Sequence, residues 1–206
     1  LSVTDVENIF NVIISFIAIH VFLYPASNGY NSYFDKDEKS IGLIENPPPV
    51  NKDLYYTSLA FDALAIVLGL LISPFFALLM LIYGLASKAY SHPGVRLKKY
   101  PFMGWFIAGF FQGYFTYVMS VEGINPGGWS LLNEPEIIFP ASLCSLLLWG
   151  SYPMTQVYQH EEDSRRGDKT LSLLLGVRGT FYFTALVFLL ANFAFVFYFY
   201  IFYSFK

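Results

Sequence analysis

Apolar residues occur along this chain in long continuous runs rather than in alternation with polar ones. A helix that crosses a membrane needs about twenty consecutive apolar residues, and runs of that order recur along the sequence. By this measure the sequence predicts six helical spans, at 7–30, 54–73, 75–91, 102–121, 137–158 and 180–203. Strands of a membrane β-barrel would show alternation instead. The predicted fold is therefore an all-α, polytopic membrane helix bundle of about six transmembrane helices.

The links between the predicted spans differ in length, and the shortest is the stretch SPFF at 73–76. We interpret it as a tight turn between the second and third spans. Pro74 suits the first turn of the third helix, where its missing N–H group is not needed.

Composition supports a membrane protein. The 206 residues are 55% hydrophobic and only 13% charged, whereas soluble domains carry about a quarter charged residues. A net charge of −3 and scattered basic residues argue against a protein that binds nucleic acid. Cys144 is the only cysteine, which excludes a disulfide or a thiolate metal site within the chain. We therefore expect membrane lipid, and no nucleic acid, around this protein.

The basic residues gather in the loops after the first, third and fifth predicted spans. All but one of the Lys and Arg residues belong to this group: Lys36, Lys39, Lys52, Lys88, Arg96, Lys98, Lys99, Arg165, Arg166, Lys169 and Arg178. Basic loops of membrane proteins face the cytoplasm. The sequence thus predicts cytoplasmic loops on this side and Leu1 outside.

A first acidic cluster follows the first span, in the stretch NGYNSYFDKDEKS at 28–40. Asn28, Asn31, Asp35 and Glu38 are spaced by three, four and three positions. If the helix continues, one of its faces carries all four side chains. This face combines carboxamide and carboxylate oxygens.

A second cluster occurs on the same predicted side, in the stretch QVYQHEEDSRRGDKT at 156–170. Gln156, Gln159 and Asp163 are again spaced for one helical face. Mg²⁺ prefers oxygen ligands, carboxylates above all, and usually keeps positions for water or phosphate. The alternative is that these charges only mark helix ends in the headgroup region. Two such faces at one membrane surface favour a shared Mg²⁺ site.

The loop AYSHPGVRLKKYP at 89–101 adds basic side chains on that side. Arg96, Lys98 and Lys99 could bind phosphate, although topology alone also explains basic loops. Acids and bases at one face suit a substrate with a diphosphate head and a lipid tail, because metal ions make diphosphate a leaving group. Aromatic rings near the clusters could hold a cation formed on the tail, although packing explains each ring equally well.

Two ionisable residues, His20 and Asp62, lie inside predicted spans. Such residues are functional candidates by default. Asp62 has two possible roles. It could be a hydrogen-bonded carboxyl that stabilises the structure, or it could assist the deprotonation of an acceptor. For His20 we expect a neutral, hydrogen-bonded role.

Taken in order, the motifs resemble those of the UbiA superfamily of intramembrane prenyltransferases. Asn31 and Asp35 match the first two positions of the family's Asn-x-x-x-Asp-x-x-x-Asp motif, while Lys39 takes the third. The family's Asp-x-x-x-Asp motif falls on Gln159 and Asp163. Residues of the connecting loop and of the segment after the second motif also fit the family pattern: Tyr90, Ser91, Pro93, Leu97, Lys98, Gly167, Thr170 and Gly176.

The resemblance implies transfer of a prenyl group from an isoprenyl diphosphate to an acceptor of one of three classes: an aromatic ring, a porphyrin-type ring or a polar-headed lipid. It implies Mg²⁺ as the cofactor, with Asn31, Asp35 and Asp163 as catalytic residues and metal ligands. Further metal ligands would be Glu38, Gln159 and Glu162. The substrate would be bound by Lys98, Arg96, Arg166, Asn28 and Tyr158.

Members of the family usually have one more helix at the start and two more at the end. We therefore expect residues 1–206 to form a single transmembrane domain that is incomplete at both ends. We place it in a bacterial inner (cell) membrane, with the motif loops in the cytoplasm.

Two other functions remain open on the residues alone. The acids of a transporter or channel would form a cation site, but such sites usually lie near mid-membrane rather than at one face. A transferase of phosphoalcohol groups would also use acids and metal at the membrane face. The order of the three motifs favours prenyl transfer.

Overall fold

The computed structural model describes residues 6–36 and 48–203, and these residues form an all-α protein. The prediction of the fold class is confirmed. By its contacts the chain divides into two compact units. Unit one comprises the described residues up to Arg96 together with Met119–Trp129. Unit two comprises Leu97–Val118 together with the described residues from Ser130 on.

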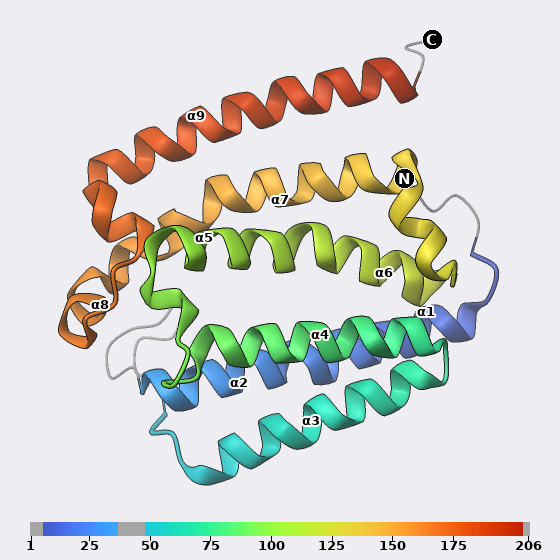
Figure 1. Ribbon diagram of the computed structural model, residues 1–206, viewed down its shortest axis with the longest axis horizontal. Helices are drawn as coiled ribbons and strands as arrows, with labels where there is room; N and C mark the ends of the chain where they lie inside the picture. Colours follow the sequence, from blue (N-terminus) through green and yellow to red (C-terminus); the bar gives the residue numbers. More distant parts are fainter. Residues whose placement is uncertain (1–5, 37–47, 204–206) are drawn as a thin grey trace. The chain divides into compact units, whose positions relative to one another are not determined.

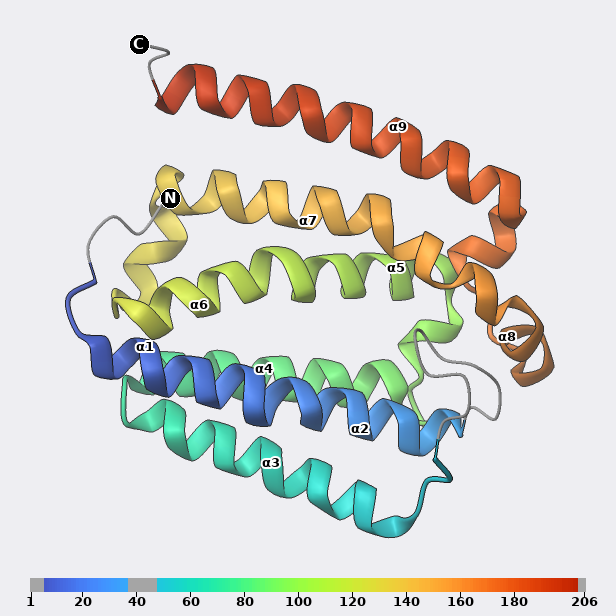
Figure 2. The same ribbon diagram turned by 180° about the vertical axis from the view of Figure 1, so that it is seen from behind.

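Unit one is built from three long helical stretches. They are the continuous run of α1 (Ile9–Phe16), the π-helical turn η1 (Ile17–Leu23) and α2 (Tyr24–Asp35), followed by α3 (Lys52–Leu70) and α4 (Pro74–Ser91). Figure 1 shows α2, α3 and α4 side by side, Figure 2 shows them from behind, and each packs on the other two. Successive stretches run in opposite directions, so the end of α2, the start of α3 and the end of α4 share one end of unit one.

Polar side chains set where these helices begin. The Asn51 side chain caps α3 by accepting hydrogen bonds from the backbone N–H groups of Asp53 and Leu54. Ser73 caps α4, accepting from the N–H of Phe76 at 2.9 Å, and Pro74 occupies the first turn. The predicted turn at SPFF is therefore found, with the cap chemistry that favours it.

The Ser73 hydroxyl also donates a hydrogen bond to a buried acid, Glu122, at 2.5 Å. Glu122 is fully buried, and its second oxygen accepts the backbone N–H groups of Gly127 and Gly128, each at 2.8 Å. Three donors offset the cost of burying this carboxylate. Glu122, in helix α6 (Thr116–Ile124), thereby ties the α3–α4 turn to the loop after α6 within unit one.

Unit two contains the remaining helices. They are η2 (Leu97–Lys99), α5 (Pro101–Gly109), the π-helical turn η3 (Phe110–Phe115), α7 (Pro135–Thr155), η5 (Val157–Gln159), α8 (His160–Arg166) and α9 (Leu171–Phe202). Two further elements belong to both units: α6 (Thr116–Ile124) begins in unit two and ends in unit one, and η4 (Gly128–Asn133) begins in unit one and ends in unit two. Within unit two, α7 packs against α5, η3 and α9.

A close approach of backbones joins α7 to η3. A Cβ atom on Gly113 would lie 2.5 Å from both the Cα and the backbone N of Ser145, so only glycine fits here. The Ser145 hydroxyl donates to the Gly109 carbonyl at 2.9 Å and accepts from the Tyr114 N–H at 2.8 Å. It thus bonds backbone groups that the π-helical turn releases from the usual α-helical pairing.

Five helical stretches of the described chain are long and apolar enough to cross a membrane: Ile9–Asp35, Lys52–Leu70, Pro74–Ser91, Pro135–Arg166 and Leu171–Phe202. The sixth predicted span, 102–121, is helical too, within Pro101–Ile124. It is not among the five because Gln112 and several glycine and tyrosine residues lower its hydropathy.

The helix that contains the last predicted span, 180–203, begins earlier than the apolar pattern indicates. The helix α9 starts at Leu171 and is interrupted at Gly176, whose φ of 67° and ψ of 172° are not helical. Such a positive φ strains any residue with a side chain, which explains a glycine at this position.

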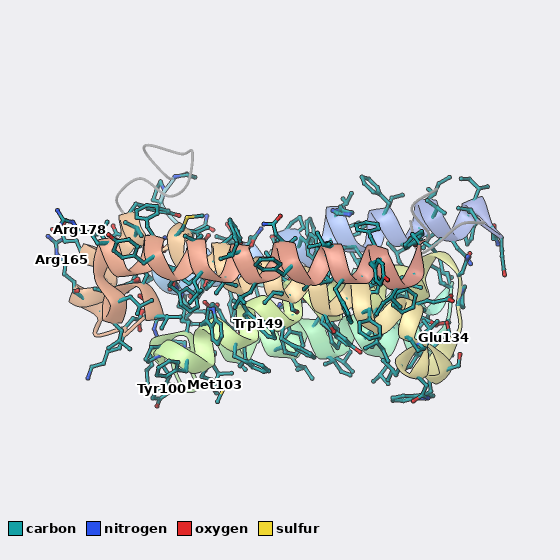
Figure 3. All side chains as sticks on the ribbon, turned by 90° about the horizontal axis from the view of Figure 1, so that it is seen from above. Tyr100, Met103, Glu134, Trp149, Arg165 and Arg178 are labelled. Carbon is teal, nitrogen blue, oxygen red and sulfur yellow. The ribbon has the colours of Figure 1, made fainter. Side chains whose placement is uncertain are left out.

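Charged side chains lie at opposite ends of unit two. Figure 3 shows Arg165 and Arg178 at one end, Glu134 at the other and Trp149 between them. This separation is what the distribution of basic loops along the sequence predicts for antiparallel spans.

Candidate functional site

The first motif lies at the end of α2. Asp35 is the last helical residue, and Lys36 follows it in the left-handed conformation with a φ of 51°. Asn31, one turn earlier, accepts a hydrogen bond through its Oδ1 atom from the hydroxyl of Ser91, at 2.7 Å. The end of α4 therefore orients the amide of the first motif.

The Asp35 carboxylate is paired with a residue from the loop after α4. Its Oδ1 lies 3.2 Å from Nη2 of Arg96, and the two side chains are only 6% and 13% exposed. Arg96 itself has a positive φ of 43°. Nearby, the rings of Phe34 and His92 meet edge to face at 5.3 Å. Asp37, Glu38 and Lys39 lie outside the described residues, so the part assigned to Glu38 stays a prediction.

The second motif centres on Asp163 in α8, which is 6% exposed. Its Oδ1 lies 3.1 Å from Nη2 of Arg166, and Arg166 Nε lies 3.7 Å from Oδ2 of Asp168, another buried acid. Gly167 ends the helix in the left-handed conformation, and the N–H of Asp168 then returns to the Asp163 carbonyl at 2.9 Å. This turn brings Asp163 and Asp168 to the same guanidinium group.

The predicted continuous face of Gln156, Gln159 and Asp163 is interrupted. The helix α7 ends at Thr155, and the tighter turn η5 separates it from α8. Two residues before α7 ends, Pro153 lies inside the helix and has no N–H group to donate to the Trp149 carbonyl four residues earlier. The indole of Trp105 donates to that carbonyl instead, at 2.8 Å.

Lys98 belongs to the surroundings of the second motif. The N–H of Lys169 donates to the carbonyl of Lys99 at 3.0 Å, which joins η2 to the loop after α8 within unit two. The Lys98 ammonium group attracts the Asp163 carboxylate electrostatically. A basic residue of the connecting loop thus interacts electrostatically with the aspartate of the second motif.

The other residues assigned by resemblance differ in exposure. Asn28 and Tyr158 are exposed, whereas Gln159 and Glu162 are half-buried. Asp35 belongs to unit one and Asp163 to unit two. Their predicted convergence on a single site stays a prediction.

The intramembrane acid Asp62 forms an ion pair with Lys88 of α4. The Lys88 ammonium also lies over the ring of Tyr30, 5.0 Å from its centroid. Sequence reasoning did not anticipate this pairing. These contacts are the ones expected if Asp62 is a structural carboxyl, which is one of the two interpretations that the sequence allows. His20 is exposed and contacts the rings of Phe16 and Tyr24, at 4.8 and 5.3 Å between centroids.

Other polar residues around the second motif were also missed. His160 bonds the Ser172 hydroxyl through Nε2 at 2.7 Å, and Ser172 contacts the Thr180 hydroxyl at 3.2 Å. Thr180 in turn donates to the Gly176 carbonyl at 2.8 Å, next to the interruption of α9. The sequence did carry a signal for these contacts, because Ser172 and Thr180 are polar residues four positions before and after Gly176.

The donor atoms of the two motifs suit Mg²⁺. Asp163 Oδ2 is buried and has no hydrogen-bond partner among residues 6–36 and 48–203. Carboxylate and amide oxygens of this kind are the ligands that Mg²⁺ prefers. Within the same residues, no group of three or more His, Cys, Asp or Glu side chains is arranged to hold a metal ion by itself. Any metal would need ligands from amides, water or substrate as well.

The helices and their apolar surfaces define the class: this is an integral membrane protein of the all-α type. Within that class, the model of the UbiA prenyltransferase family matches residues 1–205. The chain belongs to this family, whose members are prenyltransferases. Searches of curated proteins and of solved structures found no significant match.

Proposed function

We propose that this protein transfers a prenyl group from an isoprenyl diphosphate to an acceptor nucleophile, with Mg²⁺ as cofactor, at the cytoplasmic face of a bacterial cell membrane. The family match over residues 1–205 carries the proposal. The acceptor is a lipophilic ring compound or a polar-headed lipid. The buried, unpartnered oxygen of Asp163 in the second motif supports a metal at this position.

Each side chain of the motifs has a part in this reaction. The oxygens of Asn31, Asp35, Glu38, Gln159, Glu162 and Asp163 would hold Mg²⁺. A Mg²⁺ ion bound there would supply positive charge that offsets the charge of the diphosphate and makes it a better leaving group. Ser91 orients the Asn31 amide, and Lys98, Arg96 and Arg166 bind the diphosphate oxygens. Asn28 and Tyr158 are exposed beside the motifs and contact the rest of the substrate.

The pairing of Asp62 disfavours the transporter alternative. A cation site near mid-membrane would need this carboxylate as a ligand, but the Lys88 ammonium already neutralises it. Repulsion between Lys88 and an arriving cation would weaken such a site further.

Substitution of the two motif aspartates tests the proposal. Asp35→Asn and Asp163→Asn keep the size of the side chain and remove the charge that balances the metal. We expect each to lower Mg²⁺-dependent consumption of an isoprenyl diphosphate about 100-fold, which corresponds to ~2.7 kcal/mol in the transition state. Turnover is measured with the full chain in membranes, and chelation of divalent ions should abolish it.

Two control substitutions separate the motifs from general charge effects. Glu161→Gln removes an exposed acid from the same helix as Asp163 and should leave turnover nearly unchanged. Lys39→Ala, at the family's third acidic position, should matter little because a lysine cannot ligate a cation. If both aspartate variants retain near-normal, metal-dependent turnover, the site is wrongly assigned. A metal-independent ion flux would instead support a transporter.

A further inference from the structure

In each unit, the aspartate of the predicted metal motif faces an arginine. The distances are 3.2 Å from Asp35 Oδ1 to Arg96 Nη2 and 3.1 Å from Asp163 Oδ1 to Arg166 Nη2. The four side chains are between 6% and 22% exposed. Little water screens these charges, so each arginine acts strongly on whatever binds to its aspartate.

An arginine in this position acts in opposite directions on the two ligands of the proposed reaction. Its charge repels Mg²⁺ and competes with the ion for the carboxylate. The same charge attracts a diphosphate, for which the guanidinium group is a forked hydrogen-bond donor. The arginine therefore opposes the metal alone and favours the metal together with a diphosphate.

We propose that Arg96 and Arg166 make metal binding conditional on the diphosphate, so that the two ligands bind with positive cooperativity. The inference rests on the proposed function and deepens it, because it concerns the order in which the same site fills. Each aspartate stays neutralised by its arginine until a phosphorylated substrate arrives. Linkage then requires that the diphosphate raises the affinity for metal by the same factor as the metal raises the affinity for diphosphate.

The chain offers a matched control in the residue next to Arg166. Arg165 pairs with Glu161 in the same helix, but these side chains are 66% and 59% exposed. Water and salt screen such a pair. Replacing Arg165 changes the net charge of α8 by the same amount as replacing Arg166, but leaves the buried carboxylates untouched.

Equilibrium dialysis of the full chain in detergent tests the inference, with Mn²⁺ as the metal and inorganic pyrophosphate as the diphosphate. In the unaltered protein, pyrophosphate should raise the affinity for Mn²⁺ about tenfold or more, within the usual range of coupling. Arg96→Met and Arg166→Met should bind Mn²⁺ alone more tightly and Mn²⁺ with pyrophosphate more weakly. Arg166→Lys should retain the direction of the coupling, and Arg165→Met should change neither affinity.

The opposite signs distinguish coupling from structural damage, which would weaken both affinities together. If the methionine variants lose affinity under both conditions, or leave the ratio of the two unchanged, the inference is wrong. The proposed function would then still stand, provided that the unaltered protein binds Mn²⁺ with pyrophosphate. If that protein binds no Mn²⁺ under either condition, the proposed function fails and the inference fails with it.

Discussion

At the scale of single residues, two pairs of a carboxylate with a basic side chain lie in different surroundings. Asp62 and Lys88 are 15% and 18% exposed within helices that span the membrane, while Glu161 and Arg165 are largely exposed. A buried pair is costly to break because the remaining charge is left without compensation. A surface pair contributes little.

A double-mutant cycle should reveal this difference. Asp62→Asn or Lys88→Met alone should lower the free energy of unfolding by about 3 kcal/mol, because each leaves one buried charge unpaired. The combination of Asp62→Asn and Lys88→Met should cost less than the sum of the two. The matching cycle of Glu161→Gln and Arg165→Met should show an interaction of at most about 1 kcal/mol.

These free energies are measured by chemical unfolding of the full chain in detergent. Additive effects of Asp62→Asn and Lys88→Met would contradict a stabilising role for the pair. The sequence singles out Asp62 as an acid inside an apolar span, but it does not indicate Lys88 as its partner, because Lys88 is 26 positions away and lies at the end of the third predicted span with other basic residues. The pairing depends on how α3 packs against α4.

At the scale of helices, the contact between Gly113 and Ser145 leads to a prediction about packing. Gly113→Ala would place its Cβ 2.5 Å from backbone atoms of α7, so the helices must move apart. We expect a loss of about 2 kcal/mol in the free energy of unfolding, as for other overpacked sites. Gly84→Ala is the control, because its Cβ would lie 3.4 Å from Asp62 Oδ1, at ordinary contact distance.

Thermal unfolding of both variants in detergent provides the comparison. Equal stability of Gly113→Ala and Gly84→Ala would show that the close approach of α7 and η3 is unimportant. The apolar runs predicted that these helices exist, because a run of about twenty apolar residues is long enough for a helix to cross a membrane. The π-helical turns and the interruption at Gly176 were not predicted, since the apolar runs continue through η1 and η3 and a single glycine does not specify where a helix is interrupted.

At the scale of the whole molecule, the distribution of charge predicts how the chain crosses the membrane. Val95→Cys and Ser164→Cys, with Cys144 replaced, should react with a membrane-impermeant thiol reagent only from the cytoplasmic side. Gly127→Cys should react only from the opposite side. All three positions are exposed. Labelling of positions 95 and 164 from opposite sides would contradict a common membrane face for the two motifs.

The functional site shows what one sequence can and cannot predict. Spacing placed Asn28, Asn31 and Asp35 on one helix, and α2 includes all three but ends at Asp35, before the fourth predicted position. Spacing failed for Gln156 and Gln159, because it assumed one helix from Gln156 to Asp163, whereas α7 ends at Thr155 and η5 precedes α8. Partners such as Ser91 and Asp168 come from other segments or from a tight turn, and no local pattern specifies them.

The hydrogen bond from Trp105 to the Trp149 carbonyl bears on how the protein assembles in the membrane. A carbonyl released by proline must find another donor within the apolar layer. Because that donor belongs to α5, α7 inserted by itself would leave the Trp149 carbonyl unpaired near the end of α7 that leads to η5 and α8. The second motif should therefore take its final orientation only after α5 and α7 have associated, as a late event in the biogenesis of the protein.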